Sequence, residues 1–366
     1  MLTNDEILRY DRQLKTKAIG LEGQLRLKQA KVLLIGAGGL GCPALQYMAA
    51  AGIGKIHILD GDIVSESNLQ RQLLFTTNDV GKYKAEVAAG KLQFINPFID
   101  ITFQNQFLSA TLALNLFPKY NLIVDCSDNF GTRYLINDVC LLNNLTVVSA
   151  SLYQTEAQLG TFNLLLGDNT RSASYSDIFP ESDKNAQSLD CNTAGVIATL
   201  PGIMGVMQAN EVLKYFTDKT NCLTNQLLLL NAITLKTSFF KFAALNSTTK
   251  VSEEYILNKT YDIPCSTSNK LVIDISELQQ ITKNSYTIID VREKNELPII
   301  SSHKIINIPL SILNERMDEL KKYTSILFVC KSGVRSKKAA QLAKEQLIDL
   351  QIYSYKNGIE ELIKLI

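Results

Sequence analysis

Short apolar runs alternate with longer mixed segments along the first two thirds of the chain. KVLLI at 31–35 and IHILD at 56–60 are the first two runs, and NLIVD and LTVVSAS follow as two more. Continuous apolar runs of this length are typical of strands buried on both faces of a parallel sheet. CPALQYMAAAGIG, with Pro43 in its first turn, and residues 132–142 have helical patterns. The alternation predicts an α/β domain with a mostly parallel sheet, in which TFNLLL and QLLLLN flank an apolar helix beginning near Ala194.

The pattern changes between residues 246 and 270, where the chain becomes polar, rich in Ser and Thr, and carries Pro264. This composition is typical of a linker. A new strand and helix alternation follows it, from LVIDISELQQI through YTIIDVRE, SILFVC and SKKAAQLAKEQL. We therefore expect a first domain at 1–245, a linker at 246–270 and a small α/β domain at 271–366.

Length and charge narrow the functional classes. The 366 residues suggest two domains, and a formal charge of +1 gives no basic surface for nucleic acid or an anionic membrane. Seven scattered cysteines without C-x-x-C spacing, and an N-terminus without an apolar leader, favour a reduced, cytoplasmic protein. The weakly charged stretch 191–210 contains Asn, Thr, Gln and Pro, and is predicted to be a core helix rather than a membrane span.

A glycine-rich loop follows the first predicted strand. Gly36, Gly38 and Gly41 satisfy G-x-G-x-x-G between a strand and a helix, and Asp60 comes 19 residues later at the end of the next strand. Such glycines let a ligand approach the backbone at a helix N-terminus, and the acid can accept hydrogen bonds from ribose hydroxyls. The pattern predicts a nucleotide site, with a tight turn without a ligand as the alternative.

The residues after Asp60 indicate which chemistry the nucleotide undergoes. SESNLQRQ provides Asn68 and Arg71, and GKYK provides Lys84. Several cations and amides near phosphates suit transfer of an adenylyl group better than hydride transfer, because negative charge builds on the triphosphate. Asp128 and Asn129 follow strand NLIVD, where open α/β sheets bind ligands, and a carboxylate there could hold Mg²⁺.

Together, LRYDRQL, GAGGLGCPA, LDGD with SNLQRQ, GKYKAE, INP and DCSDN resemble the ThiF/MoeB/E1 family over residues 4–245. The resemblance implies a Rossmann-like domain that adenylates the C-terminal carboxylate of a ubiquitin-like protein. By motif position it implies adenosine contacts from Gly39 and Asp60, phosphate contacts from Asn68, Arg71 and Lys84, and magnesium on Asp128. It also implies a homodimer in which Arg12 reaches the partner's ATP.

The same resemblance assigns one cysteine and excludes a metal. DCNTAGV matches the family segment that carries the crossover-loop cysteine, which is Cys191 here. The alternative interpretation is that Cys191 merely packs beside a helix. Relatives usually bind zinc through two C-x-x-C pairs, but Ser174 and Asp177 stand at the first pair and the second is absent. We therefore expect no zinc.

A second cysteine site is expected near the C-terminus. In CKSGVRS, Cys330 closes a strand and precedes a glycine-containing turn and a helix, so loop N–H groups and Arg335 would favour its thiolate. This loop, with IIDVREKNEL and SHKIINIPL, resembles a rhodanese domain at 271–366. The resemblance implies a persulfide on Cys330, a supporting role for Arg335, and structural roles for Asp290, Arg292 and His303.

The two resemblances predict an enzyme with two steps. The first domain would use ATP and Mg²⁺ to adenylate the Gly-Gly carboxylate of a sulfur carrier like MoaD or ThiS. A persulfide donor would load Cys330, whose sulfur would convert the acyl adenylate to a thiocarboxylate for molybdopterin, thiamin or another product. The alternatives are adenylation of a peptide C-terminus, an NAD-dependent oxidoreductase and a non-catalytic nucleotide-binding protein.

Overall fold

The structure is a computed structural model of the chain, and it separates into two compact units, Met1–Ile263 and Pro264–Ile366. Each unit is described by itself. The described residues are 1–180, 195–244, 251–261, 272–273, 286–293, 295–296, 305–323, 325–347, 350–356 and 358–363.

The first unit is built on one large sheet. Within the described residues its strand order is β3-β2-β1-β4-β5-β6-β7-β8. The parallel half contains β1 (Lys31–Ile35), β2 (Lys55–Leu59), β3 (Asp100–Gln104), β4 (Leu122–Asp125) and β5 (Thr146–Tyr153). The antiparallel half continues from β5 through β6 (Glu156–Phe162), β7 (Gln226–Asn231) and β8 (Thr237–Lys241).

Strand β1 has four consecutive apolar residues after Lys31, and all four are buried. Val32 and Leu34 belong to one buried cluster, whereas Leu33 and Ile35 belong to the cluster on the opposite face. Because side chains alternate along a strand, four consecutive apolar residues fill two cores. The predicted α/β fold class is confirmed.

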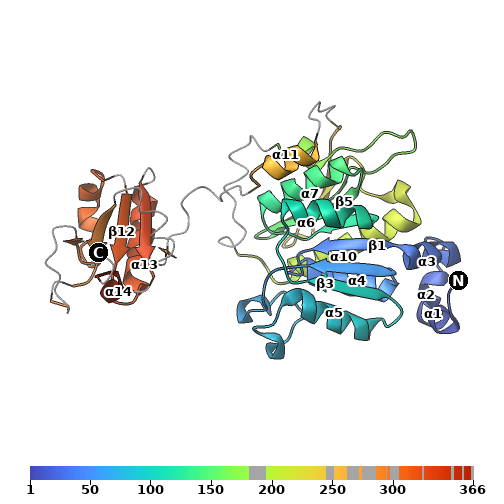
Figure 1. The fold of residues 1–366 in the computed structure, drawn as a ribbon, viewed down its shortest axis with the longest axis horizontal. Helices are drawn as coiled ribbons and strands as arrows, with labels where there is room; N and C mark the ends of the chain where they lie inside the picture. Colours follow the sequence, from blue (N-terminus) through green and yellow to red (C-terminus); the bar gives the residue numbers. More distant parts are fainter. Residues whose placement is uncertain are drawn as a thin grey trace. The chain divides into compact units, whose positions relative to one another are not determined.

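Helices cover both faces of this sheet (Figure 1). The first cluster includes residues of α4 (Gly41–Ala51), α5 (Lys84–Ile95) and α10 (Thr199–Thr217), and α10 packs against α4. The second includes residues of α6 (Ala110–Leu116), α7 (Phe130–Leu142) and α11 (Glu253–Asn258). Three helices precede β1, namely α1 (Asn4–Arg9), α2 (Asp11–Leu14) and α3 (Gly20–Gln29), and α8 (Tyr175–Ile178) follows β6.

Two element boundaries differ from the sequence prediction. The strand expected at TFNLLL ends at Phe162, because Asn163 has a positive φ of 54° and its amide donates to the carbonyls of Cys140 and Leu145. The apolar helix expected near Ala194 begins at Thr199, and Ala194 lies outside the described residues.

Part of the expected linker packs as structure. Residues 253–258 form α11, where Ile256 is fully buried in the second cluster. Lys259 Nζ and the Tyr261 hydroxyl each donate to Asp138 Oδ2 at 2.8 Å. The stretch 251–261 therefore belongs to the first unit, although its polar composition resembles a linker.

The second unit contains a parallel sheet in the order β11-β10-β12-β13-β9 among the described residues. Its strands are β9 (Val272–Ile273), β10 (Thr287–Asp290), β11 (Ile305–Asn307), β12 (Ser325–Val329) and β13 (Gln351–Tyr355). A 3-10 segment at Asn314–Leu320 and helices α13 (Val334–Gln346) and α14 (Ile359–Ile363) accompany it. Across all the described ranges, no helix combines the length and hydropathy of a membrane span.

Candidate functional site

Three glycines of the loop between β1 and α4 stand where even a Cβ atom would come too close to a neighbouring atom. Gly36 has a φ of 92°, and a Cβ there would lie 2.8 Å from the carbonyl oxygen of Cys126. A Cβ on Gly41 would lie 2.0 Å from the carbonyl oxygen of Gly36, and one on Gly39 would lie 3.0 Å from Pro201 Cβ. The glycines therefore let the loop fold back between β4 and α10.

This loop borders a cavity of about 280 Å³ at the carboxyl ends of β1, β2 and β4, where open α/β sheets bind ligands. Seven residues predicted to contact the nucleotide or its metal line it: Gly39, Asp60, Asn68, Arg71, Lys84, Asp128 and Asn129. Their chain segments are far apart in sequence. The fold thus brings together the side chains that the motifs select one by one.

Two cations lie on one side of the cavity. Lys84 begins α5 and is buried, and its Nζ pairs with Asp62 Oδ2 at 2.8 Å. Arg71 is half-buried and donates from Nη1 to the carbonyl oxygen of Ser67 at 3.1 Å. Asn68 accepts from the Ser65 N–H, so its side chain also closes the turn that carries Arg71. These contacts hold positive charge beside the glycine loop.

Asp60 braces the same loop. Its Oδ2 accepts from the backbone N–H of Ala37 at 2.6 Å, and its Oδ1 accepts from that of Asp62 at 2.7 Å. Burial raises the pKa of Asp60, although these N–H groups and the Lys84 charge oppose that effect. Each carboxylate oxygen has a second lone pair, so bracing the loop leaves capacity to accept from a ligand hydroxyl.

The other side of the cavity is formed after β4. Buried Asp125 accepts from the N–H and hydroxyl of Ser127 at 2.9 and 2.6 Å, and from the Ser149 hydroxyl at 2.6 Å. This network fixes the loop that presents exposed Asp128. Asn129 caps α7 by accepting from the Thr132 N–H at 2.8 Å. Within the described part of the chain, the Asp128 carboxylate has no hydrogen bond or ion pair.

Sequence reasoning missed several lining residues. Arg133 is buried and donates to the Ser127 carbonyl at 2.9 Å, and Phe107 lies over Gly61. Gln72 ends the SNLQRQ motif and is buried, and its Oε1 has no hydrogen-bond partner among the described residues. The position of Gln72 directly after Arg71 was a usable signal, whereas nothing in the sequence pairs Phe107 with Gly61.

Of the remaining predicted residues, Arg12 is not among those that line this cavity. Arg12 lies on α2 with 94% of its side chain exposed and an Asp11 carboxylate at 3.9 Å. Cys191 falls outside the described residues, as does His303. Ser174 and Asp177, which stand in place of the first C-x-x-C pair, form a capping box at the start of α8. Among the described residues, no group of three or more His, Cys, Asp or Glu side chains is arranged to hold a metal.

The second unit carries a cysteine at the end of β12. Cys330 is fully buried, and its Sγ receives the backbone N–H of Ser336 at 3.3 Å. Burial raises the pKa of this thiol. The Ser336 hydroxyl and the backbone N–H groups of Ser336, Ser332 and Arg335 outweigh burial, so the pKa of Cys330 is lowered overall. The loop therefore stabilises a thiolate.

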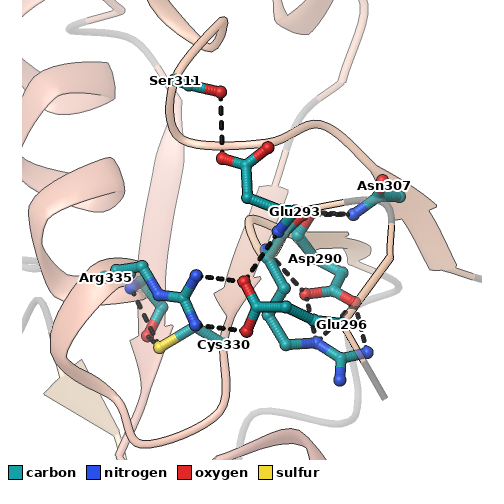
Figure 2. A network of polar contacts seen from close by, with 9 residues as sticks. Asp290, Glu293, Glu296, Asn307, Ser311, Cys330 and Arg335 are labelled. Atoms are coloured by element: carbon teal, nitrogen blue, oxygen red, sulfur yellow. Dashed lines mark hydrogen bonds and ion pairs between the residues drawn. The ribbon is translucent and has the colours of Figure 1, made fainter. Parts of the chain in front are cut away.

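Arg335 faces Glu296 beside this thiol (Figure 2). Both guanidinium Nη atoms bond to the carboxylate, with Nη2 to Oε2 at 2.7 Å. This contact, with the N–H of Glu293, lowers the pKa of Glu296 to about 2. The bidentate pair fixes the side chain of Arg335, whose backbone N–H points to Cys330. Sequence analysis did not identify Glu296.

The Asp290–Arg292 segment supports the neighbouring turn. Arg292 Nε lies 3.0 Å from both Asp290 oxygens, and Asn307 Nδ2 donates to the carbonyls of Asp290 and Arg292 at 3.0 and 2.9 Å (Figure 2). Both ionic side chains are buried. Glu293, next in the chain, accepts from the Ser311 hydroxyl at 3.0 Å.

Comparisons with known proteins agree with both halves of this description. The ThiF family matches residues 10–251, and the rhodanese-like domain matches residues 274–364. A probable molybdopterin-synthase adenylyltransferase of Porphyra purpurea is 37% identical over 99% of this chain and 94% of its own length. The probable adenylyltransferase/sulfurtransferase MoeZ of Mycobacterium tuberculosis is 34% identical over 94% of this chain and 90% of its own.

Solved structures share the fold of the first unit. The crystal structure of E. coli MccB with AMPCPP and MccA has a TM-score of 0.57 at 23% identity, and covers 66% of this chain and 73% of MccB. This likeness concerns the fold alone. The family matches and the full-length relatives carry the assignment: the chain belongs to the ThiF family and is an adenylyltransferase with a C-terminal rhodanese-like sulfurtransferase domain.

Proposed function

We propose that this enzyme adenylates the C-terminal Gly-Gly carboxylate of a ubiquitin-like sulfur carrier of the MoaD/ThiS type, and then converts it to a thiocarboxylate. The observation that carries the proposal is the convergence of the nucleotide-motif residues on one cavity, in a chain that also holds a thiolate-stabilising cysteine loop. An adenylating enzyme that forms an amide needs no such loop. The fused rhodanese-like domain therefore favours a sulfur carrier over a peptide substrate.

In the first step, a carboxylate oxygen of the carrier attacks the α-phosphorus of ATP, and pyrophosphate leaves with the bonding electrons. Gly39 and Asp60 contact the adenosine, while Asn68, Arg71 and Lys84 hold the phosphates. Fixed cations offset the charge that develops during phosphoryl attack. Lys84 is paired with Asp62 and is buried, so ATP takes up a cation that is already oriented toward the cavity.

Magnesium fits the same cavity. Mg²⁺ usually binds through one or two carboxylates together with substrate phosphates. Asp128 supplies an exposed carboxylate at the carboxyl end of β4, with Asn129 beside it. Bound there, Mg²⁺ would neutralise phosphate charge. The Asp125–Ser127 network holds the loop that presents Asp128.

In the second step, the outer sulfur of a Cys330 persulfide attacks the carbonyl carbon of the acyl adenylate, and AMP leaves. The product is an acyl disulfide between the carrier and Cys330. A thiolate then attacks Cys330 Sγ and expels the carrier thiocarboxylate, leaving a disulfide on the enzyme. Cys191 is our candidate for that thiol, and an external thiol reductant restores both cysteines. Arg335 keeps the loop in shape through Glu296.

Partners and location follow from this chemistry. A persulfide donor must load Cys330, and we propose that it transfers a sulfane sulfur to the thiolate as its own thiol leaves. We also propose a homodimer in which the exposed Arg12 reaches the partner's ATP, and a cytoplasmic location. The five described cysteines are free, consistent with a reducing compartment. The Danio rerio relative named adenylyltransferase and sulfurtransferase MOCS3, 32% identical, supports the pairing of activities.

ATP–pyrophosphate exchange tests the first step. With Gly-Gly-ending carriers of the host we expect carrier-dependent exchange, which Arg71→Ala abolishes and Cys330→Ala retains. Cys330→Ala should instead abolish sulfur transfer from a persulfide donor to the carrier. Exchange that is unaffected by Arg71→Ala, or lost in Cys330→Ala, would contradict this division of labour. Exchange driven by short peptides alone would favour the peptide alternative.

A further inference from the structure

Two buried serines form a chain of hydroxyl groups behind the Cys330 thiol. Ser336 Oγ lies 3.4 Å from Cys330 Sγ and donates to the carbonyl oxygen of Gly333 at 3.1 Å. Ser354 Oγ donates to Ser336 Oγ at 2.9 Å. Both serines have no exposed surface. Water therefore does not compete for the hydrogen bond between these hydroxyls.

Ser354 is placed by the sheet and not by the cysteine loop. It lies on β13, in parallel register with Phe328 on β12, two residues before Cys330. Ser336 lies in the first turn of α13. The hydrogen bond between the serines thus connects the strand beside β12 to the helix whose N–H groups surround the thiol. Among the described residues, the buried Ser354 hydroxyl has one hydrogen-bond partner, the Ser336 hydroxyl.

The contact between the serines sets the direction of the hydrogen bonds around the sulfur. Each hydroxyl has one proton, and Ser354 gives its proton to Ser336 while Ser336 gives its own to Gly333. In this arrangement Ser336 Oγ accepts from the Cys330 thiol. After the thiol loses its proton, the sulfur can only accept, so the Ser336 hydroxyl stabilises it by turning from the Gly333 carbonyl and donating to the sulfur. Ser354 continues to donate to Ser336 throughout, which polarises that hydroxyl and strengthens its donation.

We propose that Ser354 is a positioning residue of the sulfur site, which holds and polarises the Ser336 hydroxyl so that it donates to the Cys330 thiolate. The inference rests on the proposed role of Cys330 as the sulfur-carrying nucleophile. Ser354 does not touch the sulfur and acts through Ser336. A serine hydroxyl is uncharged, so removing either one changes no charge at the site. The Arg335 guanidinium beside the thiol remains paired with Glu296.

The pH dependence of alkylation measures this role without any sulfur donor or carrier. Iodoacetamide forms a bond to the thiolate and iodide leaves, so the rate at Cys330, followed on its own peptide by mass spectrometry, reports thiolate population. At pH values below the midpoint we expect Ser354→Ala to slow alkylation about two- to fourfold, and Ser336→Ala at least about tenfold. The limiting rate at high pH should remain unchanged in Ser354→Ala.

Ser325 provides a matched control. It is a buried serine at the start of β12, and its hydroxyl has no hydrogen-bond partner among the described residues. Ser325→Ala should keep the wild-type pH profile, and Ser354→Thr, which retains the hydroxyl, should restore it. A Ser354→Ala profile that superimposes on wild type would overturn the proposal. So would an equal shift in Ser325→Ala, which would reflect general loosening of the sheet.

A second variant distinguishes a folding defect from loss of the positioning role. If thermal melting shows that Ser354→Ala is unfolded at the assay temperature, Ser354→Cys, which keeps the volume with a weaker donor, takes its place under the same criteria. The proposed function can fail independently, because loss of carrier-dependent turnover with an intact alkylation profile concerns only the transfer steps. A shifted profile in Ser354→Ala supports the positioning role in either case.

Discussion

Gly38 and Gly41 belong to one motif, yet the structure predicts opposite consequences for a methyl group at each. A Cβ on Gly38 would meet a single atom within 4 Å, Gln72 Nε2 at 3.7 Å, and Gly38 lines the nucleotide cavity. A Cβ on Gly41 would lie 2.0 Å from the carbonyl oxygen of Gly36. Gly38→Ala therefore fills space meant for a ligand, whereas Gly41→Ala collides with backbone.

The magnitudes follow from these distances. Gly38 has no positive φ, so alanine is compatible with its backbone, and the loss of unfolded-state freedom stabilises the fold by about 0.4–1 kcal/mol. A methyl forced into a fitted site costs about 1–3 kcal/mol, which corresponds to roughly 5- to 150-fold weaker ATP binding. Gly41→Ala costs about 1–3 kcal/mol or more of folding stability, because the carbonyl it meets is backbone.

Urea unfolding and calorimetric titration with a non-hydrolysable ATP analogue separate the two effects. We expect Gly38→Ala to unfold at the same or a higher urea concentration and to bind the analogue weakly. Gly41→Ala should unfold at a lower concentration. Normal nucleotide binding by a fully folded Gly38→Ala would refute the reasoning, because the phosphates would then not pass over this loop.

Three further predictions concern stability and reactivity. Ile256→Ala should lower the free energy of unfolding by about 2–5 kcal/mol because Ile256 is fully buried, whereas exposed Leu257→Ala should change it by less than about 0.5 kcal/mol in the same urea titration. Burial raises the pKa of Asp79, but hydrogen bonds from Lys91 and Thr76 lower it to about 2. The resulting stabilisation of about 2 kcal/mol is complete above pH 4 and disappears toward pH 2, so Asp79→Asn should destabilise the protein at pH 7 and not at pH 2. Burial raises the pKa of Cys42 and Cys222 to about 12, whereas hydrogen bonds to the sulfur lower the pKa of Cys330. Native-state alkylation at pH 7 should therefore label Cys330 long before either; equal labelling would contradict the stabilised thiolate at Cys330.

The sequence predicted those parts of the fold whose signal is local. Strand β1 was predicted to the residue because Val32–Ile35 are apolar on both faces and glycine follows them. The antiparallel half was harder, because its strand ends depend on tertiary contacts. Asn163 ends β6 through bonds to carbonyls near residues 140 and 145, which no periodicity reveals. Likewise, α11 lies in a stretch whose polar composition predicted a linker, and the burial of Ile256 alone ties it to the first unit's core.

In the candidate site, too, the sequence predicted residues with a local signal and missed those that depend on tertiary contacts. Motif spacing selected Asn68, Arg71 and Lys84, because they follow one another closely after β2. It did not select Glu296 or Asp125, because their importance lies in what they hold. Glu296 lies inside the IIDVREKNEL motif, but the motif assigns it no role. Its role follows from its contact with Arg335, 39 residues away. The role of such a supporting residue depends on the contact with its partner. A single sequence lists both residues and does not show that they touch.

The cysteines show why motif and environment are both needed to explain reactivity. Cys126, Cys140 and Cys330 are all buried, and burial raises the pKa of each thiol. For Cys126 and Cys140 burial dominates, because few donors reach the sulfur. At Cys330 the first turn of α13 and its preceding loop aim several N–H groups and a hydroxyl at one atom, which reverses the direction. Burial at this site excludes water from a stabilised thiolate, and that combination suits a cysteine that must hold a sulfane sulfur without losing it to solvent.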